Sequence, residues 1–475
     1  MRTVTEYRTE RDTLGEVRVP KDAAYGAQTQ RAVENFPVSG RRMPRAFIAA
    51  LAHVKSACAE ANLALRPLQM TPEACALIQE ACARIAAGEL DRDFPVDVFQ
   101  TGSGTSTNMN ANEVIANLGN EKAGGRRGVY QPLHPNDHVN MGQSSNDVIP
   151  TAAHLAALLA IHRELKPALD RLEASLGRKA AEFDGILKLG RTHLMDAVPV
   201  RLGQEFGGYA MQVRKGREQV ERAAKGLEEL AIGGTATGTG LNAHPEFATR
   251  VCALLQKKLG IPVREARNHF EAQGGRDDMA MVSGALKGLA CALTKIANDL
   301  RWMGSGPHGG LAELRIPDLQ PGSSIMPGKV NPVMAEMLVQ VAAQVIGNDA
   351  AITIGAQGGA FELNVMIPVL TANLLDSIAI LTNGSRLFAQ RCVDGLQADA
   401  ARCAELLERS PISATVLNPV LGYERTAALI KDALAKKASV KQLAVEQGLI
   451  TKEQAESLFD FRKMTEPGSA GGPGS

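Results

Sequence analysis

The stretch PGSSIMPGKVNPVMAEMLVQVAAQVIG, residues 321–347, places a stiff polar loop directly before a helical pattern. Two glycines permit backbone angles that other residues avoid, and two prolines restrict the rest of the loop. Asn331 followed by Pro332 predicts an N-cap and a first helical turn, whose unpaired N–H groups face the serines and favour anions. The helix after it is apolar around most of its circumference, so a single neighbouring layer would not cover it.

Long helical stretches of this kind recur through the middle of the chain and favour a mainly α bundle, since Ala and Leu dominate and aromatics make up only 4%. The predicted stretches are roughly residues 149–187, 198–230, 270–303, 332–346 and 361–396. Helices that are this long and apolar on several sides suggest that subunits share one bundle, so we expect a homo-oligomer.

Three domains are expected from the length of 475 residues and from the changes in pattern. Residues 1–143 form a mixed, mostly helical N-terminal domain, and residues 144–400 form the central five-helix bundle domain with the polar loop. Residues 401–475 form a small helical C-terminal domain that ends in a tail, EPGSAGGPGS, expected to be disordered.

Composition excludes several classes of function. The 52 Lys and Arg nearly cancel the 51 Asp and Glu, so no global field attracts nucleic acid or an anionic membrane. Seven scattered cysteines show neither CxxC nor metal-ligand spacing, which predicts reduced thiols, no metal and no cofactor. The charged N-terminus, MRTVTEYRTERD, is unlike a secretory signal, and no run of about 18 apolar residues predicts a membrane span. We therefore expect a cytoplasmic protein.

Three further polar blocks stand at predicted helix boundaries: TGSGTSTNMNANEV at 101–114, HPNDHVNMGQSSNDVIPTA at 134–152 and LGRTHLMDAVPVRLGQE at 189–205. Hydroxyls and amides bind a carboxylate without needing a net positive charge. A lone histidine is more often a packing residue than a catalyst, but His193 stands beside Thr192 just before a predicted helix, as the polar groups of the other blocks do.

Two other patterns favour structural interpretations. IGGTATGTGLN, residues 232–242, lacks the preceding strand and the GK[ST] of a phosphate loop, so it predicts a flexible connection between helices. Residues 438–459 have a helix, glycine turn and helix, as DNA readers do, but the near-zero net charge favours a small accessory domain.

In the four polar blocks the sequence resembles the class II fumarases of the fumarase/aspartase superfamily, over nearly the whole chain. GSSIMPGKVNP is the superfamily signature, and His193 and His134 stand where aspartases typically have glutamine and asparagine. The resemblance implies reversible hydration of fumarate to (S)-malate in the tricarboxylic acid cycle. It also implies the three-domain fumarase/aspartase fold, with a homotetramer whose central helices form one core and whose active sites each draw on three subunits.

The resemblance also implies the roles of individual residues. Ser323 is the base, whose oxyanion needs backbone N–H groups, the helix start and a cation. His193 activates or delivers water and is oriented by Glu336. The implied substrate-binding residues are Ser103, Gly104, Thr105, Ser144, Ser145, Asn146, Thr192, Ser324, Lys329, Val330 and Asn331.

A second dicarboxylate site is implied near the surface, at His134, Pro135, Asn136 and Asp137. Many relatives have an arginine where this chain has Gln131, so we expect Arg126 or Arg127 to take its place if the site is occupied.

Three alternatives stay open from the sequence. The nearest is an aspartate ammonia-lyase of the same superfamily, against which His193 speaks. A catalytically silent structural relative would be expected to lose polar site residues, and this chain keeps them. DNA binding by the C-terminal helices is the third.

Overall fold

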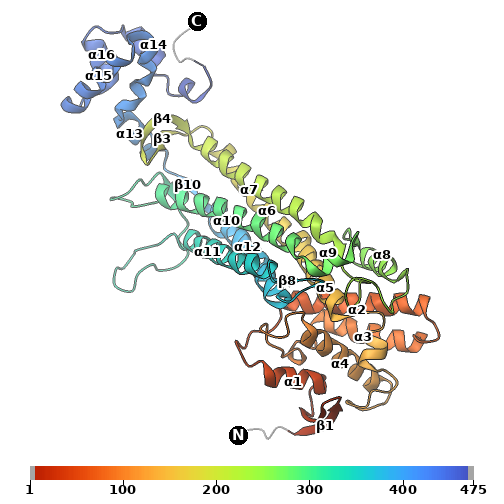
Figure 1. Ribbon diagram of the computed structural model, residues 1–475. Helices are drawn as coiled ribbons and strands as arrows, with labels where there is room; N and C mark the ends of the chain where they lie inside the picture. Colours follow the sequence, from red (N-terminus) through yellow and green to blue (C-terminus); the bar gives the residue numbers. More distant parts are fainter. Residues whose placement is uncertain (1–5, 469–475) are drawn as a thin grey trace. The chain divides into compact units, whose positions relative to one another are not determined.

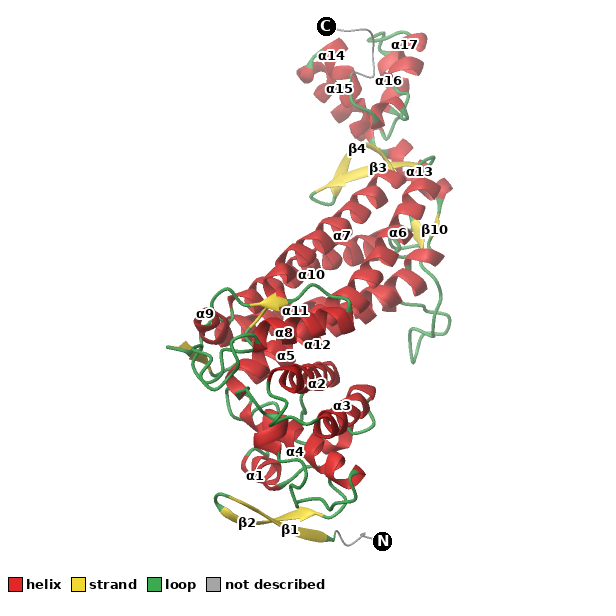
Figure 2. Ribbon diagram, turned by 90° about the vertical axis from the view of Figure 1, so that its right-hand side faces the viewer, coloured by secondary structure: helices red, strands yellow, loops and turns green. Residues whose placement is uncertain are grey.

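The computed structural model describes residues 6–468, and within this range it is mostly helical, with strands only in two-stranded pairs (Figure 1, Figure 2). The helices are α1 (Ala27–Asn35), α2 (Arg45–Leu65), α3 (Pro72–Ala87), α4 (Thr105–Lys122), α5 (Ser145–Ala160), α6 (Lys166–Glu182), α7 (Leu202–Ala224), α8 (Phe247–Leu259), α9 (His269–Gly274), α10 (Asp277–Met303), α11 (Val333–Ala356), α12 (Ile367–Arg391), α13 (Ala400–Arg409), α14 (Asn418–Leu421), α15 (Tyr423–Lys436), α16 (Val440–Glu446) and α17 (Lys452–Leu458). The short 3₁₀ and π turns are η1 (Asp91–Asp93), η2 (Pro135–Val139), η3 (Ile161–Leu165), η4 (Lys225–Glu228), η5 (Val393–Gly395), η6 (Pro411–Leu417) and η7 (Lys463–Thr465). The predicted mainly α class is confirmed.

The strands are short and pair with one neighbour each. Antiparallel pairs join β1 (Tyr7–Asp12) with β2 (Gly15–Pro20), β3 (Leu187–Thr192) with β4 (Met195–Arg201), β7 (Leu314–Arg315) with β10 (Gln397–Ala398), and β8 (Gly359–Ala360) with β9 (Leu363–Asn364). β5 (Glu229–Leu230) and β6 (Arg264–Glu265) form a parallel pair.

The chain divides into two compact units, which are described separately. The first takes Met1–Pro167, Gly216–Ala290 and Val341–Asn383, and the second takes Ala168–Lys215, Cys291–Gln340 and Gly384–Ser475. The predicted N-terminal domain lies within the first unit and the predicted C-terminal domain within the second, while the central domain contributes to both. The three domain boundaries therefore stay a prediction.

The long helices lie close to where the periodicity predicts them. α5, the π turn η3 and α6 follow one another without a break over residues 145–182, and α10, with 27 residues, is about 40 Å long at about 1.5 Å per residue. Three boundaries are wrong: α11 continues to Ala356, past the predicted end at 346, α12 begins only at Ile367, after the strand β9, and residues 198–201 belong to the strand β4 rather than to a helix. The alternation of Val198 and Val200 with other residues fits the pleat of a strand, and α7 begins only at Leu202.

A seam of buried residues at spacings of three and four explains why these helices pack together. In α10 the large apolar residues of this seam are Met279, Val282, Leu286, Leu289, Leu293, Ile296, Leu300 and Met303. This 3–4 repeat is the pattern of left-handed helix packing, in which apolar side chains fill holes between residues of a neighbouring helix.

The bundle helices also leave apolar surface uncovered in the single chain. Ile346 and Ile354 of α11 are exposed, as are Met281 of α10 and Met211 of α7. By length and composition alone, α10, α11 and the segment Ile367–Gly395 are apolar enough to cross a membrane, contrary to the expectation from the sequence. In α11, only 33% of the most apolar window is buried.

The end of the second unit has a core of its own. Its buried residues come from η6 and α15 to α17 and include Leu417, Leu429, Leu443 and Leu458. Thr451 opens α17 with a capping box, since its side chain accepts from the Gln454 N–H and the Gln454 side chain accepts from the Thr451 N–H. This confirms short helices after residue 401.

Candidate active site

The loop between β7 and α11 is closed on itself by hydrogen bonds at its base. The Gly322 N–H donates to the Lys329 carbonyl at 2.7 Å, and Asn331 Nδ2 donates to the Gly322 carbonyl at 2.7 Å. A Cβ atom on Gly322 would stand 2.7 Å from the Lys329 carbonyl oxygen, so no larger residue fits there. Gly328 has φ +80°, a value that favours glycine. The backbone thus holds this loop in one shape.

The Ser323 hydroxyl of this loop accepts hydrogen bonds from two backbone N–H groups. Its Oγ accepts hydrogen bonds from the backbone N–H groups of Ile325 at 3.2 Å and Met326 at 3.0 Å. Two preorganised donors on one oxygen stabilise negative charge there, because they need no reorganisation when the charge forms. The neighbouring Ser324 is exposed.

The start of α11 differs from the predicted cap. The Pro332 carbonyl accepts from the N–H groups of Ala335 at 3.0 Å and Glu336 at 3.1 Å, so the helix begins where it was expected. The side chain of Asn331 accepts no backbone N–H of the helix among the described residues, and its Nδ2 instead donates to the Gly322 carbonyl and closes the loop. The prediction of a helix start is confirmed, and that of a side-chain cap is wrong.

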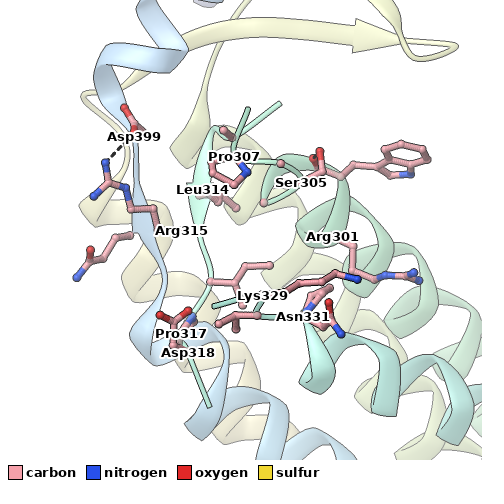
Figure 3. Close-up of a pocket in the computed structure, with 18 of the residues that line it drawn as sticks. Arg301, Ser305, Pro307, Leu314, Arg315, Pro317, Asp318, Lys329, Asn331 and Asp399 are labelled. Carbon is pink, nitrogen blue, oxygen red and sulfur yellow. Dashed lines mark hydrogen bonds and ion pairs between the residues drawn. The ribbon is translucent and has the colours of Figure 1, made fainter. Parts of the chain in front are cut away.

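A cavity of about 1190 Å³ in the second unit brings four of the predicted residues together (Figure 3). Lys329, Val330, Asn331 and Glu336 line one side of it. The remaining lining comes largely from the end of α10, the segment after it and the residues before α13. The Lys329 ammonium that borders this space attracts carboxylates and can stabilise negative charge that develops on one.

Sequence reasoning missed the other charged residues of this cavity. Arg301 and Trp302 line it from the end of α10, and Arg315 pairs with Asp399 at 3.0 Å (Figure 3). The sequence did carry a signal: the glycine-rich segment GSGPHGG directly follows α10, as the other polar blocks adjoin helices.

Thr192 and His193 stand at the tip of the β3–β4 hairpin, not before a helix as predicted. Thr192 pairs with Met195, which leaves His193 and Leu194 as a two-residue turn with φ +57° and +60°. Such turns normally use Asn-Gly, because larger residues rarely adopt positive φ. Strained, exposed side chains at a tip are typical of functional sites, and here they present His193 to solvent.

Buried ion pairs hold the base of this hairpin. Arg191 makes two hydrogen bonds to Glu313, at 2.9 and 3.0 Å, and the fully buried Glu313 also lies 3.4 Å from Lys188. Lys188 donates to Glu205 at 2.9 Å, and burial raises the pKa of Glu205 while Lys188 opposes the rise. Breaking such a buried pair is costly, so the strand leading to His193 is firmly fixed.

The predicted contact between Glu336 and His193 is not made within one chain. No hydrogen bond or ion pair joins these two residues in the described part of the chain. Glu336 stands in the first turn of α11, and His193 is exposed at its hairpin tip. The orienting role of Glu336 therefore stays a prediction.

In the first unit, two other polar blocks meet at the starts of α4 and α5. The Ser103 and Thr105 hydroxyls lie 2.9 Å apart on either side of Gly104, which has φ +75°. A Cβ atom on Gly104 would come within 2.8 Å of Ile149 in α5, so the two helix starts are neighbours. Two adjacent helix N-termini favour an anion.

The serine segment, which we define as residues 144–146, is built into the start of α5. Ser144 caps the helix through a capping box with Asp147, and Ser145 Oγ accepts from Asn108 Nδ2 at 3.0 Å. Asn146 donates to the Ala236 carbonyl at 2.8 Å. The predicted substrate-binding residues Ser144, Ser145 and Asn146 are thus rigidly placed.

Asp147 also fixes the glycine loop 232–242. One of its oxygens accepts from Ser144 N–H at 2.9 Å, and the other from the N–H groups of Gly233 at 3.0 Å and Thr235 at 2.9 Å. Burial raises the pKa of Asp147 to about 6, and these hydrogen bonds oppose the rise. The first four residues of the loop are buried, so the interpretation of a flexible connection is wrong for them.

The second polar site lies at the π turn η2. His134 Nδ1 accepts from the N–H groups of Asn136 and Asp137, both at 3.3 Å, and Pro135 opens the turn. Arg127 does not reach this group, because it is paired twice with Glu121, at 2.7 and 3.1 Å.

Of the two arginines proposed to replace the one missing at Gln131, Arg127 is therefore already engaged. Arg126 is exposed.

Comparisons with known proteins identify the class and then the family. A family model described as Lyase matches residues 15–347, and one described as Fumarase C C-terminus matches residues 414–466. The first match shows that the chain is a lyase. The second match covers the helices α14 to α17 and assigns them to the C-terminal domain of fumarase C. Fumarate hydratase class II of Mycobacterium tuberculosis is 56% identical over 445 residues, covering 94% of this chain and 92% of that protein.

Two further relatives agree. Fumarate hydratase class II of Corynebacterium glutamicum is 53% identical over 468 residues, covering 97% of both chains. The crystal structure of recombinant class II fumarase from Schistosoma mansoni matches with a TM-score of 0.94 and 37% identity, over 97% of this chain and 100% of that chain. The chain belongs to the class II fumarate hydratase family.

Proposed function

We propose that the protein is a hydro-lyase that catalyses the reversible hydration of fumarate to (S)-malate by proton abstraction through an aci-carboxylate intermediate. The observation that carries this proposal is the Ser323 hydroxyl, which accepts two backbone N–H groups on the closed loop of a chain in this family. The dicarboxylate substrate follows from the fumarate hydratases to which the chain is similar.

In the dehydration direction, Ser323 removes the proton from the carbon next to a carboxylate. Its negative charge is stabilised by the N–H groups of Ile325 and Met326. The electron pair left on carbon moves into the carboxylate, and the Lys329 ammonium, with Asn331 beside it, meets the charge that develops there. Lys329 is exposed and has the reach for this contact.

The hydroxide leaves in the second step and needs a proton. We assign this proton to His193, held forward by the strained turn of its hairpin, with Glu336 of another subunit as its orienting carboxylate. In the hydration direction the same imidazole takes a proton from the attacking water. Thr192, on the same tip, is assigned to substrate binding.

The other carboxylate of the substrate is assigned to the starts of α4 and α5. Ser103, Thr105 and the serine segment supply hydroxyl and amide donors at two neighbouring helix N-termini, which favour an anion without a buried cation in contact with it. Glycine is required at position 104 because the Cβ atom of any other residue there would collide with Ile149.

We propose that the protein is a homotetramer with active sites shared by three subunits. The uncovered side of α11 supports this, because it carries the exposed Ile346 and Ile354 together with the polar Gln340 and Gln344. Glutamines on such a face are expensive in lipid but common between packed helices, so partner subunits explain this surface better than a membrane does.

Aspartate ammonia-lyase activity is the alternative within the superfamily. His193 disfavours it, because water is a poorer nucleophile than ammonia and hydroxide a poorer leaving group, so hydration has the greater need of an imidazole relay. We further propose a cytoplasmic enzyme of the tricarboxylic acid cycle that needs no metal, since the cysteines lack the spacing of an iron–sulfur ligand set.

The test is the loss of fumarate ultraviolet absorbance when purified protein is added in the presence of EDTA and air. We expect full activity with fumarate and none when aspartate is offered instead. Inactivation by the chelator would refute the metal-independent assignment, and turnover of aspartate without turnover of malate would replace the hydratase by an ammonia-lyase. Light scattering should give about four times the chain mass of 50.4 kDa.

A further inference from the structure

Lys55 of α2 is a fully buried lysine whose ammonium contacts only amides. Its side chain is 0% exposed, and its Nζ donates to Asn140 Oδ1 at 3.0 Å and to Gln143 Oε1 at 2.9 Å. No carboxylate lies within ion-pair distance of it in the described part of the chain. A buried charge without a carboxylate partner destabilises a fold, and methionine would occupy similar space without this cost.

The two amides that Lys55 holds belong to the stretch leading into the serine segment. Asn140 Oδ1 also accepts from Asn108 Nδ2 and Asn112 Nδ2, each at 3.2 Å. Asn108 Nδ2 in turn donates to Ser145 Oγ at 3.0 Å. One carbonyl oxygen thus receives three donors, and one of these donors also holds a predicted substrate-binding hydroxyl.

The backbone of the same stretch depends on these side chains. Asn140 Nδ2 donates to the Gln143 carbonyl at 3.1 Å, and Gln143 Nε2 donates to the carbonyls of Val139 at 3.0 Å and Met141 at 3.2 Å. Because Gln143 immediately precedes Ser144, removing the ammonium loosens the chain at the point where it enters the site.

We propose that Lys55 is a positioning residue of the hydration reaction: its ammonium fixes residues 140–143 so that the serine segment meets a substrate carboxylate, and it adds a positive charge behind that segment. The proposal rests on the proposed function. Lys55 does not touch the substrate itself. A buried charge acts through low-dielectric surroundings, so it favours a dianion more than an exposed lysine at the same distance would.

The titratable groups that face the ammonium lie on three helices. They are Cys58 on α2, Cys82 on α3 and Asp147 on α5, while α4 presents the neutral amides Asn108 and Asn112. Burial lowers the pKa of Lys55 to about 8 and raises that of Cys82 to about 12. Lys55 therefore loses its charge as the pH rises through about 8, where the thiols are still neutral.

The experiment compares Lys55→Met, which removes charge and donors, with Lys55→Gln, which keeps a donor without the charge. For Lys55→Met we expect the KM for malate to rise about tenfold with kcat within about threefold, because binding to the serine segment is common to ground and transition states. For Lys55→Gln we expect a smaller rise. In the wild-type enzyme we expect KM to rise above about pH 8, and in Lys55→Met we expect no such rise.

Lys179→Met is the matched control. Lys179 is also buried, but it donates to the Leu396 carbonyl and to Glu182, each at 2.8 Å, and to neither amide that Lys55 holds. We expect it to change thermal stability only, with KM and the pH profile unchanged. If Lys55 had a purely structural role, Lys55→Met and Lys55→Gln would both have a lower apparent kcat and an unchanged KM.

Calorimetric titration with succinate, an unreactive four-carbon dicarboxylate, separates this proposal from the proposed function. We expect about tenfold weaker succinate binding in Lys55→Met. If wild-type protein binds succinate but does not hydrate fumarate, the proposed function fails and the Lys55 comparison still stands. Equal affinities in wild type and Lys55→Met overturn the positioning role, and absence of succinate binding to wild type overturns both.

Discussion

Replacing Ser323 by alanine removes one oxygen that accepts two backbone N–H groups, at 3.2 and 3.0 Å. The donors belong to Ile325, which is 84% exposed, and Met326, which is 48% exposed, so water can take the place of the lost acceptor. The folded loop should therefore survive, since its base is closed by Gly322 and Asn331 and not by the serine.

The expected effects on stability and on turnover differ widely. Losing two solvent-compensated hydrogen bonds should cost less than about 1 kcal/mol of unfolding free energy. Losing a general base should lower kcat by about 10² to 10⁴-fold, which corresponds to about 3 to 5.5 kcal/mol of the barrier. Each backbone donor to an ionised oxygen is worth about 1.5 to 3 kcal/mol, so the geometry at Ser323 is sufficient for an effect of this size.

The assay is the steady-state dehydration of malate, followed by fumarate absorbance, together with thermal unfolding and light scattering of the same preparations. Ser324→Ala is the matched control: it removes the neighbouring hydroxyl, which we assign to substrate binding, and should raise KM with little change in kcat. A Ser323→Ala enzyme with kcat within threefold of wild type would contradict the assignment of Ser323 as the base. A variant that no longer assembles would contradict the prediction that the loop keeps its fold without the serine hydroxyl.

Three further predictions concern the charged and paired groups of the site. Lys329→Ala should raise KM and lower kcat together in the malate assay, because the ammonium meets the substrate before and during reaction; a change in neither removes it from the site. His193→Asn should lower the rate of malate dehydration by about 10²-fold or more. Glu336→Gln should lower this rate less and move the pH optimum downward, because the imidazole loses a negative partner that favours its protonated form. If both variants have the rate and the pH–rate profile of wild type from about pH 5.5 to 9, His193 and Glu336 do not form the proposed relay. In a further experiment, the inactive variants His193→Asn and Ser323→Ala are mixed, unfolded and refolded together into hybrid oligomers. If each site takes these two residues from different subunits, the mixture should regain about one quarter of the wild-type activity. If no activity returns, both residues of a site belong to one chain.

The helices and the signature loop could be predicted because their signals are local. Apolar residues at spacings of three and four mark α10 wherever its partners lie, and the glycines and prolines of residues 321–331 restrict the backbone by their own sterics. Two of the errors at the site also have local causes. Asparagine is common at helix starts and so predicts a cap at Asn331, but the Nδ2 of this residue donates to the Gly322 carbonyl and closes the loop. The hairpin at His193 lacks the Asn-Gly that usually marks such a turn.

The sequence by itself determined the class of fold, the family and the polar blocks that carry the chemistry, because periodicity and motif are properties of neighbouring residues. Only the tertiary structure decided which of those blocks meet and what holds them. It gave Ser323 its two donors, joined the starts of α4 and α5, and placed Lys55 behind the serine segment, 85 residues from Asn140 along the chain. Contacts between residues so far apart depend on how helices pack, and buried polar groups accept whatever partners that packing supplies.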